Sequence, residues 1–224
     1  MYGEVVFKDR YNVEGMFAEF RMYRKEKDDN VEMTFTFKFD KQPGMMMQVP
    51  EEETVYKTVV YPKIADSYES PYLSWDNLLY CSNSYGPVPV IKYMNYAVQE
   101  GKKVAATVYP EDYNEYLTIL NNPGECEIFP FTIDEYEFEL MVCRKGKLKD
   151  YFDLDKILEI YKACDFNLDT EKLKNYFEQD LVWFGNKDCP FDIINPYGYE
   201  DNIICGLFFG YPLGSTIERL KNIR

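Results

Sequence analysis

Histidine is absent from this chain of 224 residues, although tyrosine occurs 21 times. Without an imidazole, the chain cannot form a Ser-His-Asp triad or a Cys-His nucleophile pair. Zinc sites with histidine ligands, two-histidine iron sites and histidine-bound haem are excluded for the same reason. Acid–base chemistry would therefore depend on the side chains of Asp, Glu, Lys, Tyr or Cys.

The sequence also lacks a paired-cysteine motif, a long apolar run and a recognisable leader. No C-x-x-C occurs among the six widely spaced cysteines, which are Cys81, Cys126, Cys143, Cys164, Cys189 and Cys205. This spacing is typical neither of a zinc ribbon nor of a redox dithiol. No apolar run reaches about 18 residues, and the start of the chain does not resemble a signal peptide. We expect a cytoplasmic protein with free, mostly buried thiols, no cofactor and no membrane contact.

Positive charge is scarce, because 25 basic side chains face 39 acidic ones and the formal net charge is −14. This charge disfavours direct binding to nucleic acid or to an anionic membrane, and it favours a basic protein as partner. An apolar content of 46%, with 17% aromatic residues, excludes a disordered chain. A folded chain of this size buries about 70% of its surface, so its core needs neither disulfides nor metals.

The first third of the chain has the patterns of β-strands. Apolar and polar residues alternate from Val31 to Phe39, which predicts a strand with one buried face. The preceding run from Met16 to Tyr23 is also strand-like, so we expect a hairpin from about Gly15 to Phe39. Residues 54–61 form another β-branched and aromatic run, which predicts a further strand.

The middle of the chain alternates between helical and strand patterns. Prolines, glycines and asparagines punctuate it, and they set the expected boundaries. The expected elements are a long loop with one helical turn near Trp75 (62–89), a helix (90–99), a strand (103–109), a helix (110–121) and a strand (133–143).

The C-terminal third becomes helical. Asp153 and Asp169 are placed to cap two amphipathic helices that follow them. The chain should then end in a strand from Ile203 to Phe209, a glycine turn, and a helix that starts at Ser215. A capping box between Ser215 and Glu218 would stabilise the start of that last helix.

These patterns together predict an α+β fold, with antiparallel strands and segregated helices. A β-rich α+β domain should occupy residues 1–149. A mostly helical subdomain that ends in strand, turn and helix should occupy residues 150–224 and pack on it.

Two short motifs match ligand-binding loops only in part. The glycines of residues 210–215 precede an expected helix, but a phosphate loop needs wider glycine spacing and a lysine. The oxygen-bearing side chains of residues 165–169 have the spacing of calcium ligands, but the loop glycine and the final glutamate are missing. We interpret the first motif as a tight turn and the second as a helix cap.

An acidic stripe is the first candidate binding feature. On one strand, Glu135, Glu137 and Glu139 would point the same way, roughly 6.6–6.8 Å apart. Such a stripe is either the solvated side of an antiparallel strand or a docking surface for a basic partner. Three carboxylates at this spacing lie too far apart to bind one metal ion unaided.

Aromatic residues in the loop at residues 62–89 are the second candidate, and they include Tyr68, Tyr72, Tyr85 and Trp75. Tyrosines on loops are favoured at recognition surfaces, because each ring buries much area at a low entropic cost. The alternative is that these rings fix a long loop to the core.

We favour an acidic, non-enzymatic interaction protein of the inhibitor, antitoxin-like or anti-defence type. It would present these carboxylates and aromatic rings to a basic surface, such as that of a nucleic-acid-binding protein. One alternative is a carboxylate-dependent, metal-assisted hydrolase or transferase with its site near residues 210–215. A second alternative is a structural component of a virion or a larger assembly, and the oligomeric state stays open.

Overall fold

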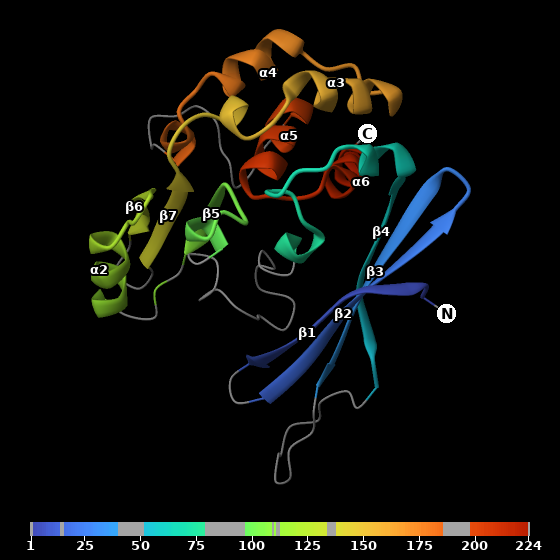
Figure 1. Cartoon of the computed structure of the whole chain (residues 1–224), viewed down its shortest axis with the longest axis horizontal. Helices are drawn as coiled ribbons and strands as arrows, with labels where there is room; N and C mark the ends of the chain where they lie inside the picture. The colour runs from blue at the N-terminus through green and yellow to red at the C-terminus, as the bar shows by residue number, and fades with distance from the viewer. Residues whose placement is uncertain are drawn as a thin grey trace.

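Four strands form an antiparallel meander in the N-terminal part of the chain (Figure 1). They are β1 (Glu4–Val13), β2 (Met16–Lys27), β3 (Asn30–Phe39) and β4 (Thr54–Pro62), paired in that order. The computed structural model describes residues 2–13, 16–39, 52–78, 97–108, 110, 113–133, 138–185 and 198–223. The hairpin of β2 and β3 and the strand over residues 54–61 are confirmed.

The alternation in β3 separates two faces of this sheet. Val31, Met33 and Phe35 are buried and belong to the main hydrophobic core. Thr34 and Thr36 lie on the opposite face and are buried as well. On that face, the hydroxyl of Thr36 donates a hydrogen bond to Glu53. The outer face is therefore covered by polar side chains of the sheet itself.

The segment after β4 crosses the core in two short 3-10 helices, η1 (Lys63–Ser67) and η2 (Trp75–Leu78). The helical turn expected near Trp75 is confirmed in this form. Asn77 is buried, and its side-chain amide donates to the carbonyl of Gly210 at 2.8 Å. This bond ties the segment to the C-terminal helices.

A second antiparallel sheet follows, in the strand order β5-β7-β6. Its elements are β5 (Ala105–Val108), β6 (Cys126–Ile133) and β7 (Phe138–Arg144), with α2 (Tyr113–Asn121) against one face. The strand expected over 103–109 and the helix over 110–121 are confirmed in their central residues. The helix expected over 90–99 lies largely outside the described residues.

The continuous strand predicted from Ile133 to Cys143 is wrong. β6 ends at Ile133, β7 starts at Phe138, and these two residues pair in antiparallel strands. The chain therefore reverses direction inside the predicted strand. The alternation of apolar and polar residues does not show where one strand ends and its antiparallel partner begins.

Four α-helices build the C-terminal part: α3 (Leu154–Ala163), α4 (Thr170–Phe177), α5 (Tyr199–Phe208) and α6 (Leu213–Ile223). Two 3-10 helices, η3 (Leu148–Asp150) and η4 (Leu181–Gly185), lie before α3 and after α4. Both predicted caps are confirmed, because the carboxylates of Asp153 and Asp169 accept from the backbone N–H of Lys156 and Lys172.

The ending of the chain differs from the prediction. The expected strand from Ile203 to Phe209 is helical, because it lies within α5 and the loop that follows. The side chains of residues 202–208 are all buried, and a short run that is apolar on every side does not separate strand from helix. The predicted capping box is also wrong, since α6 starts at Leu213 and the carbonyl of Pro212 accepts from the Ser215 N–H at 3.0 Å.

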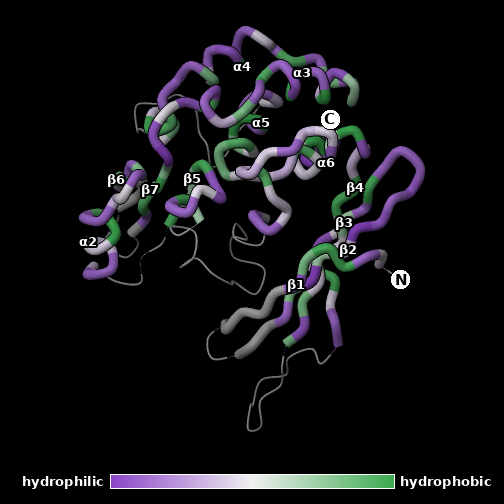
Figure 2. Tube along the Cα trace, in the orientation of Figure 1, coloured by the Kyte–Doolittle hydropathy of each residue, from purple (hydrophilic) through white to green (hydrophobic). Residues whose placement is uncertain are grey.

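One hydrophobic cluster joins the N-terminal sheet, one face of β7 and the helices α3 to α6. In Figure 2 the outer layer of α3 and α4 is largely hydrophilic, whereas α5 beneath it is hydrophobic. The fold is α+β, as expected. The domain boundary at residue 150 stays a prediction, and the shared cluster extends across it. Among the described residues, no helix has the length and apolar character that a membrane span requires.

Candidate functional site

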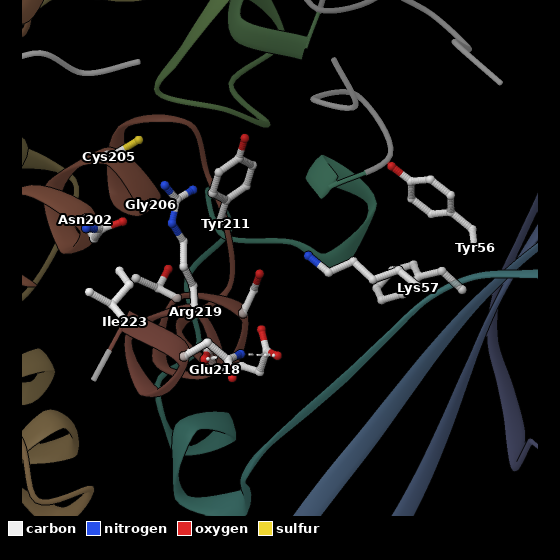
Figure 3. Close-up of a pocket in the computed structure, with 13 residues that line it drawn as sticks. Tyr56, Lys57, Asn202, Cys205, Gly206, Tyr211, Glu218, Arg219 and Ile223 are labelled. Carbon is white, nitrogen blue, oxygen red and sulfur yellow. Dashed lines mark hydrogen bonds between the residues drawn. The ribbon is translucent and has the colours of Figure 1, made fainter. Parts of the chain in front are cut away.

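A cavity of about 400 Å³ lies between the N-terminal sheet and the C-terminal helices. Its walls come from β3, β4, α5, α6 and the turn between the last two helices. Figure 3 shows Tyr56 and Lys57 on the β4 side, with Arg219 on α6 and Tyr211 on the turn across from them. The cavity thus brings together side chains from distant parts of the sequence.

The strand β4 has a β-bulge where it lines the cavity. Phe35 pairs with Lys57, but its neighbour Thr36 pairs with Val55, so Tyr56 is the extra residue of the bulge. Lys57 follows the bulge and lies in the same row as Val59 and Tyr61, whose side chains are buried against the helices. Local sequence patterns give little sign of this bulge.

Two glycines bring α6 close to its neighbours and fix the floor of the cavity. A Cβ atom on Gly206 would lie 2.4 Å from Oγ1 of Thr216, so α5 and α6 touch at this point. A Cβ atom on Gly214 would lie 2.5 Å from the ring of Tyr61, so α6 also touches β4. The positions of α6 side chains around the cavity therefore depend on two tight contacts.

The charged groups of the cavity are two cations and one carboxylate, namely Lys57, Arg219 and Glu218. The side-chain amide of Asn222 donates to Oε1 of Glu218 at 2.8 Å (Figure 3). Within the described part of the chain, neither Lys57 nor Arg219 forms an ion pair with a carboxylate. The cavity is therefore positive in a protein whose net charge is strongly negative.

Carboxylates do not converge here as a carboxylate-dependent hydrolase would require. Glu218 is the one acidic residue among the described residues that line the cavity. Elsewhere in the described ranges, no group of three or more Cys, Asp or Glu side chains is placed to hold a metal ion. The turn at residues 210–215, proposed for that chemistry from the sequence, contributes Tyr211 and Ser215 to the wall.

The described cysteines Cys126, Cys143, Cys164 and Cys205 are buried, as expected. Burial raises the pKa of the Cys126 and Cys164 thiols, and it raises that of Cys143 to about 12. A thiol with a raised pKa is a poor nucleophile at neutral pH. Cys81 and Cys189 lie outside the described residues.

The aromatic residues singled out in the loop pack on the core where the structure describes them. Trp75 contacts the ring of Tyr61, with ring centroids 5.0 Å apart. Tyr72 packs edge-on against Tyr151 at 5.2 Å. The hydroxyl of Tyr68 accepts a hydrogen bond from the N–H of Asp153 at 2.9 Å. These contacts fit the alternative in which the rings fix the loop, and a binding role for them stays a prediction.

Tyr85 lies outside the described residues, and so do Glu135 and Glu137 of the predicted acidic stripe. Glu139 is half-buried on β7. Its face of the strand continues into Met141 and Cys143, which are fully buried in the main core. An open solvated face along this strand, on which the stripe was based, is therefore not present at its C-terminal end.

Negative charge is nevertheless concentrated in this region, which we call the acidic unit (residues 97–143). It contains ten acidic side chains and two basic ones, so it carries −8 of the net charge of −14. Glu125 is exposed, Glu127 and Glu139 are half-buried, and none of the three forms an ion pair in the described part of the chain. Tyr113 on α2 is 57% exposed, and sequence reasoning missed it.

Comparisons with protein-family models, with curated proteins and with solved structures found no match for this chain. Two features of the molecule indicate a function, namely the acidic unit and the positive cavity between β4 and α6. The strands β5, β6 and β7 and the helix α2 of the acidic unit lie on the other side of α5 from β4 and α6 (Figure 1).

Proposed function

We propose that this protein is a non-enzymatic interaction protein that binds a basic protein surface through its acidic unit. The concentration of charge in residues 97–143 is the observation that supports the proposal most strongly. Like charges gathered in one layer repel one another and disfavour the folded state. A surface of this kind gains binding energy and specificity when it meets a partner of opposite charge.

The geometry of the second sheet favours a broad contact. Glu127 pairs with Cys143 at one end of β7, and Glu139 lies at the other end, so the two half-buried glutamates lie at the two ends of a face whose central residue, Met141, is buried. Four residue steps along the strand separate Glu139 from Cys143, so the two glutamates lie roughly 13 Å apart along the strand. That spacing suits several lysines or arginines of an extended surface better than one small cation.

An exposed aromatic ring also belongs to the acidic unit, on α2. Tyr113 stacks on Tyr116, with ring centroids 5.9 Å apart, and Tyr116 is anchored in the core beneath α2. Exposed tyrosines are typical of protein-binding surfaces. Tyr113 can also hold a lysine or an arginine over its ring.

The partner class that fits best is a protein whose basic groove binds nucleic acid. Such a groove presents lysines and arginines that are spaced for phosphates, and carboxylates can neutralise the same side chains. By occupying the groove, the acidic unit would act as an inhibitor. The interaction should weaken steeply as salt rises, because exposed charges are screened within about 8 Å at physiological ionic strength.

A decalysine peptide tests the location of the binding surface. Carbodiimide joins carboxylates to lysine amines without a spacer, and mass spectrometry then maps the joined residues. We expect the cross-links to concentrate on Glu125, Glu127 and Glu139, and to disappear at high salt. Cross-links spread evenly over the exposed carboxylates of α3 and α4 would contradict the proposal.

Two charge-matched variants test its specificity. The double variant Glu125→Lys/Glu127→Lys changes the acidic unit by +4 units of charge. The control Asp155→Lys/Glu159→Lys makes the same change on exposed, unpaired residues of α3. We expect decalysine affinity, measured at low salt, to fall about tenfold or more in the first variant and by far less in the second. Equal losses in both variants would show that net charge, and not the acidic unit, controls binding.

A further inference from the structure

The cavity between β4 and α6 has a charge opposite to that of the whole protein. Lys57 and Arg219 reach its space from opposite walls (Figure 3). Glu218, the one carboxylate among the described lining residues, accepts a hydrogen bond from Asn222 on the same helix, and within the described residues it forms no ion pair with either cation. The cavity thus keeps two positive groups free to meet an anion.

The position of Lys57 is unusual for a structural residue. It occupies the row of β4 that faces the helices, where the next two members, Val59 and Tyr61, are buried apolar or aromatic side chains. An apolar side chain in this row would extend the core, whereas an ammonium group must stay hydrated or find an anion. Tyr56, the extra residue of the bulge, precedes Lys57 and lines the cavity beside it.

Hydrogen-bond donors line the inner wall beside these cations. The hydroxyl-bearing residues Ser215 and Thr216 are only 8% and 5% exposed, and both lie in the first turns of α6. Tyr211 lines the wall above them. The Thr216 hydroxyl lies in the contact with α5, so Ser215 is the hydroxyl donor of this wall, and a buried hydroxyl beside two cations is a donor that phosphate oxygens use in proteins.

We propose that this cavity binds a small phosphorylated molecule, with its phosphate between Lys57 and Arg219 and its organic part against Tyr56 and Tyr211. A phosphate monoester carries about −1.5 to −2 charges at neutral pH, which matches the two cations. The guanidinium of an arginine can also bind two phosphate oxygens at once. A single carboxylate would leave one cation without a partner.

The size of the cavity sets the class of ligand. At about 400 Å³ it falls within the range of roughly 300–1,000 Å³ of small-molecule sites. This volume suits a mononucleotide or a sugar phosphate and excludes a nucleic-acid duplex. The tyrosine rings at its edge favour a ligand with a flat organic part. The site is independent of the acidic unit, since none of its lining residues belongs to residues 97–143.

Isothermal titration calorimetry with three probes tests the proposal. Adenosine 5′-monophosphate should bind, inorganic phosphate should bind more weakly, and adenosine should give no measurable heat. Each of the variants Lys57→Gln and Arg219→Gln should lower the affinity for the monophosphate about tenfold or more, because each removes a charged partner. The control Lys221→Gln removes an exposed cation from the same helix outside the cavity and should leave the affinity unchanged.

The variants should fold normally, because both replaced side chains are exposed. Thermal unfolding without ligand would show this directly. The proposal is overturned if millimolar monophosphate and inorganic phosphate both fail to bind the unmodified protein. It is also overturned if Lys57→Gln and Arg219→Gln bind as well as Lys221→Gln does.

Discussion

Replacing Gly214 with alanine should force α6 away from β4. A Cβ atom at this position would lie 2.5, 2.6 and 2.8 Å from three ring atoms of Tyr61. Carbon atoms normally pack about 3.5–4.0 Å apart, so the helix or the ring has to move by about 1 Å. The ring cannot move freely, because it is 1% exposed and packs against Trp75 at 5.0 Å between ring centroids.

The expected loss of stability follows from two opposing effects. Overpacking a core costs about 1–3 kcal/mol, and the fixed ring places this site in the upper half of that range. Alanine in place of glycine returns at most about 0.5–1 kcal/mol through its helix propensity. The net loss should therefore be about 1–2.5 kcal/mol, which lowers the unfolding temperature by roughly 2–10 °C in a protein of this size.

Urea unfolding followed by circular dichroism measures this loss, and a double-mutant cycle assigns it to the contact. In a Tyr61→Ala background the ring is gone, so Gly214→Ala should cost close to nothing. Gly214→Ser adds an oxygen to the same crowded position and should cost at least as much as alanine. The contact with Tyr61 does not limit this position if Gly214→Ala leaves the free energy of unfolding unchanged, or if its cost is the same in the Tyr61→Ala background.

Three further changes should have distinct effects on stability. Asn77→Ala removes the buried amide that donates to Gly210, and should cost about 1–3 kcal/mol in urea unfolding. Asp153→Ala removes the cap on the N–H of Lys156 and should cost about 1 kcal/mol, whereas Asp153→Asn should be nearly neutral. Partial burial works to raise the pKa of Glu53, but hydrogen bonds from two neighbouring hydroxyl groups outweigh it and hold this pKa below 4.5. The stability that Glu53 contributes is thus present above about pH 4.5 and is lost as pH falls through the lowered pKa, so Glu53→Gln should flatten that acid limb.

The sequence predicted correctly those elements that depend on residues close together in the chain, such as β3 and the two aspartate helix caps. The alternation in Val31 to Phe39 matches a strand with one face on the core, and it predicted β3 to within a residue. The carboxylates of Asp153 and Asp169 make contacts within a single helical turn. Such contacts depend on residues three or four positions apart, so no knowledge of the tertiary fold is needed.

The errors arose where long-range packing decides the conformation. Residues 203–208 are buried on all sides between other helices, so α5 has no polar face to reveal its period. The run predicted as one strand before Cys143 includes the end of β6 at Ile133 and the start of β7 at Phe138, which pair with each other. The hydrophobic pattern gave neither the change of direction between β6 and β7 nor the helical conformation of α5, because both depend on packing against distant residues.

The cavity could not be predicted for a related reason. Lys57 shares its side of β4 with Val59 and Tyr61, but nothing local in the sequence shows that Arg219 of α6 lines the same cavity, which depends on the close approach of α6 to Tyr61 at Gly214. None of these residues belongs to a motif of fixed spacing. The concentration of acidic residues between 97 and 143 is visible in the sequence, and it extends well beyond the three glutamates of the predicted stripe.

The two proposed sites bind ligands of opposite charge, a cationic peptide at the acidic unit and an anionic phosphate in the cavity. Each binding assay can therefore serve as the control for variants of the other site. The elements β5, β6, β7 and α2 of the acidic unit lie on the other side of α5 from β4 and α6 in Figure 1, and exposed charges are screened within about 8 Å at physiological salt. Glu125→Lys/Glu127→Lys should therefore abolish the preference for decalysine while leaving monophosphate affinity intact. Arg219→Gln should do the reverse. If either variant changed both affinities by the same factor, a general effect of net charge would explain the binding, and neither surface would be a specific site.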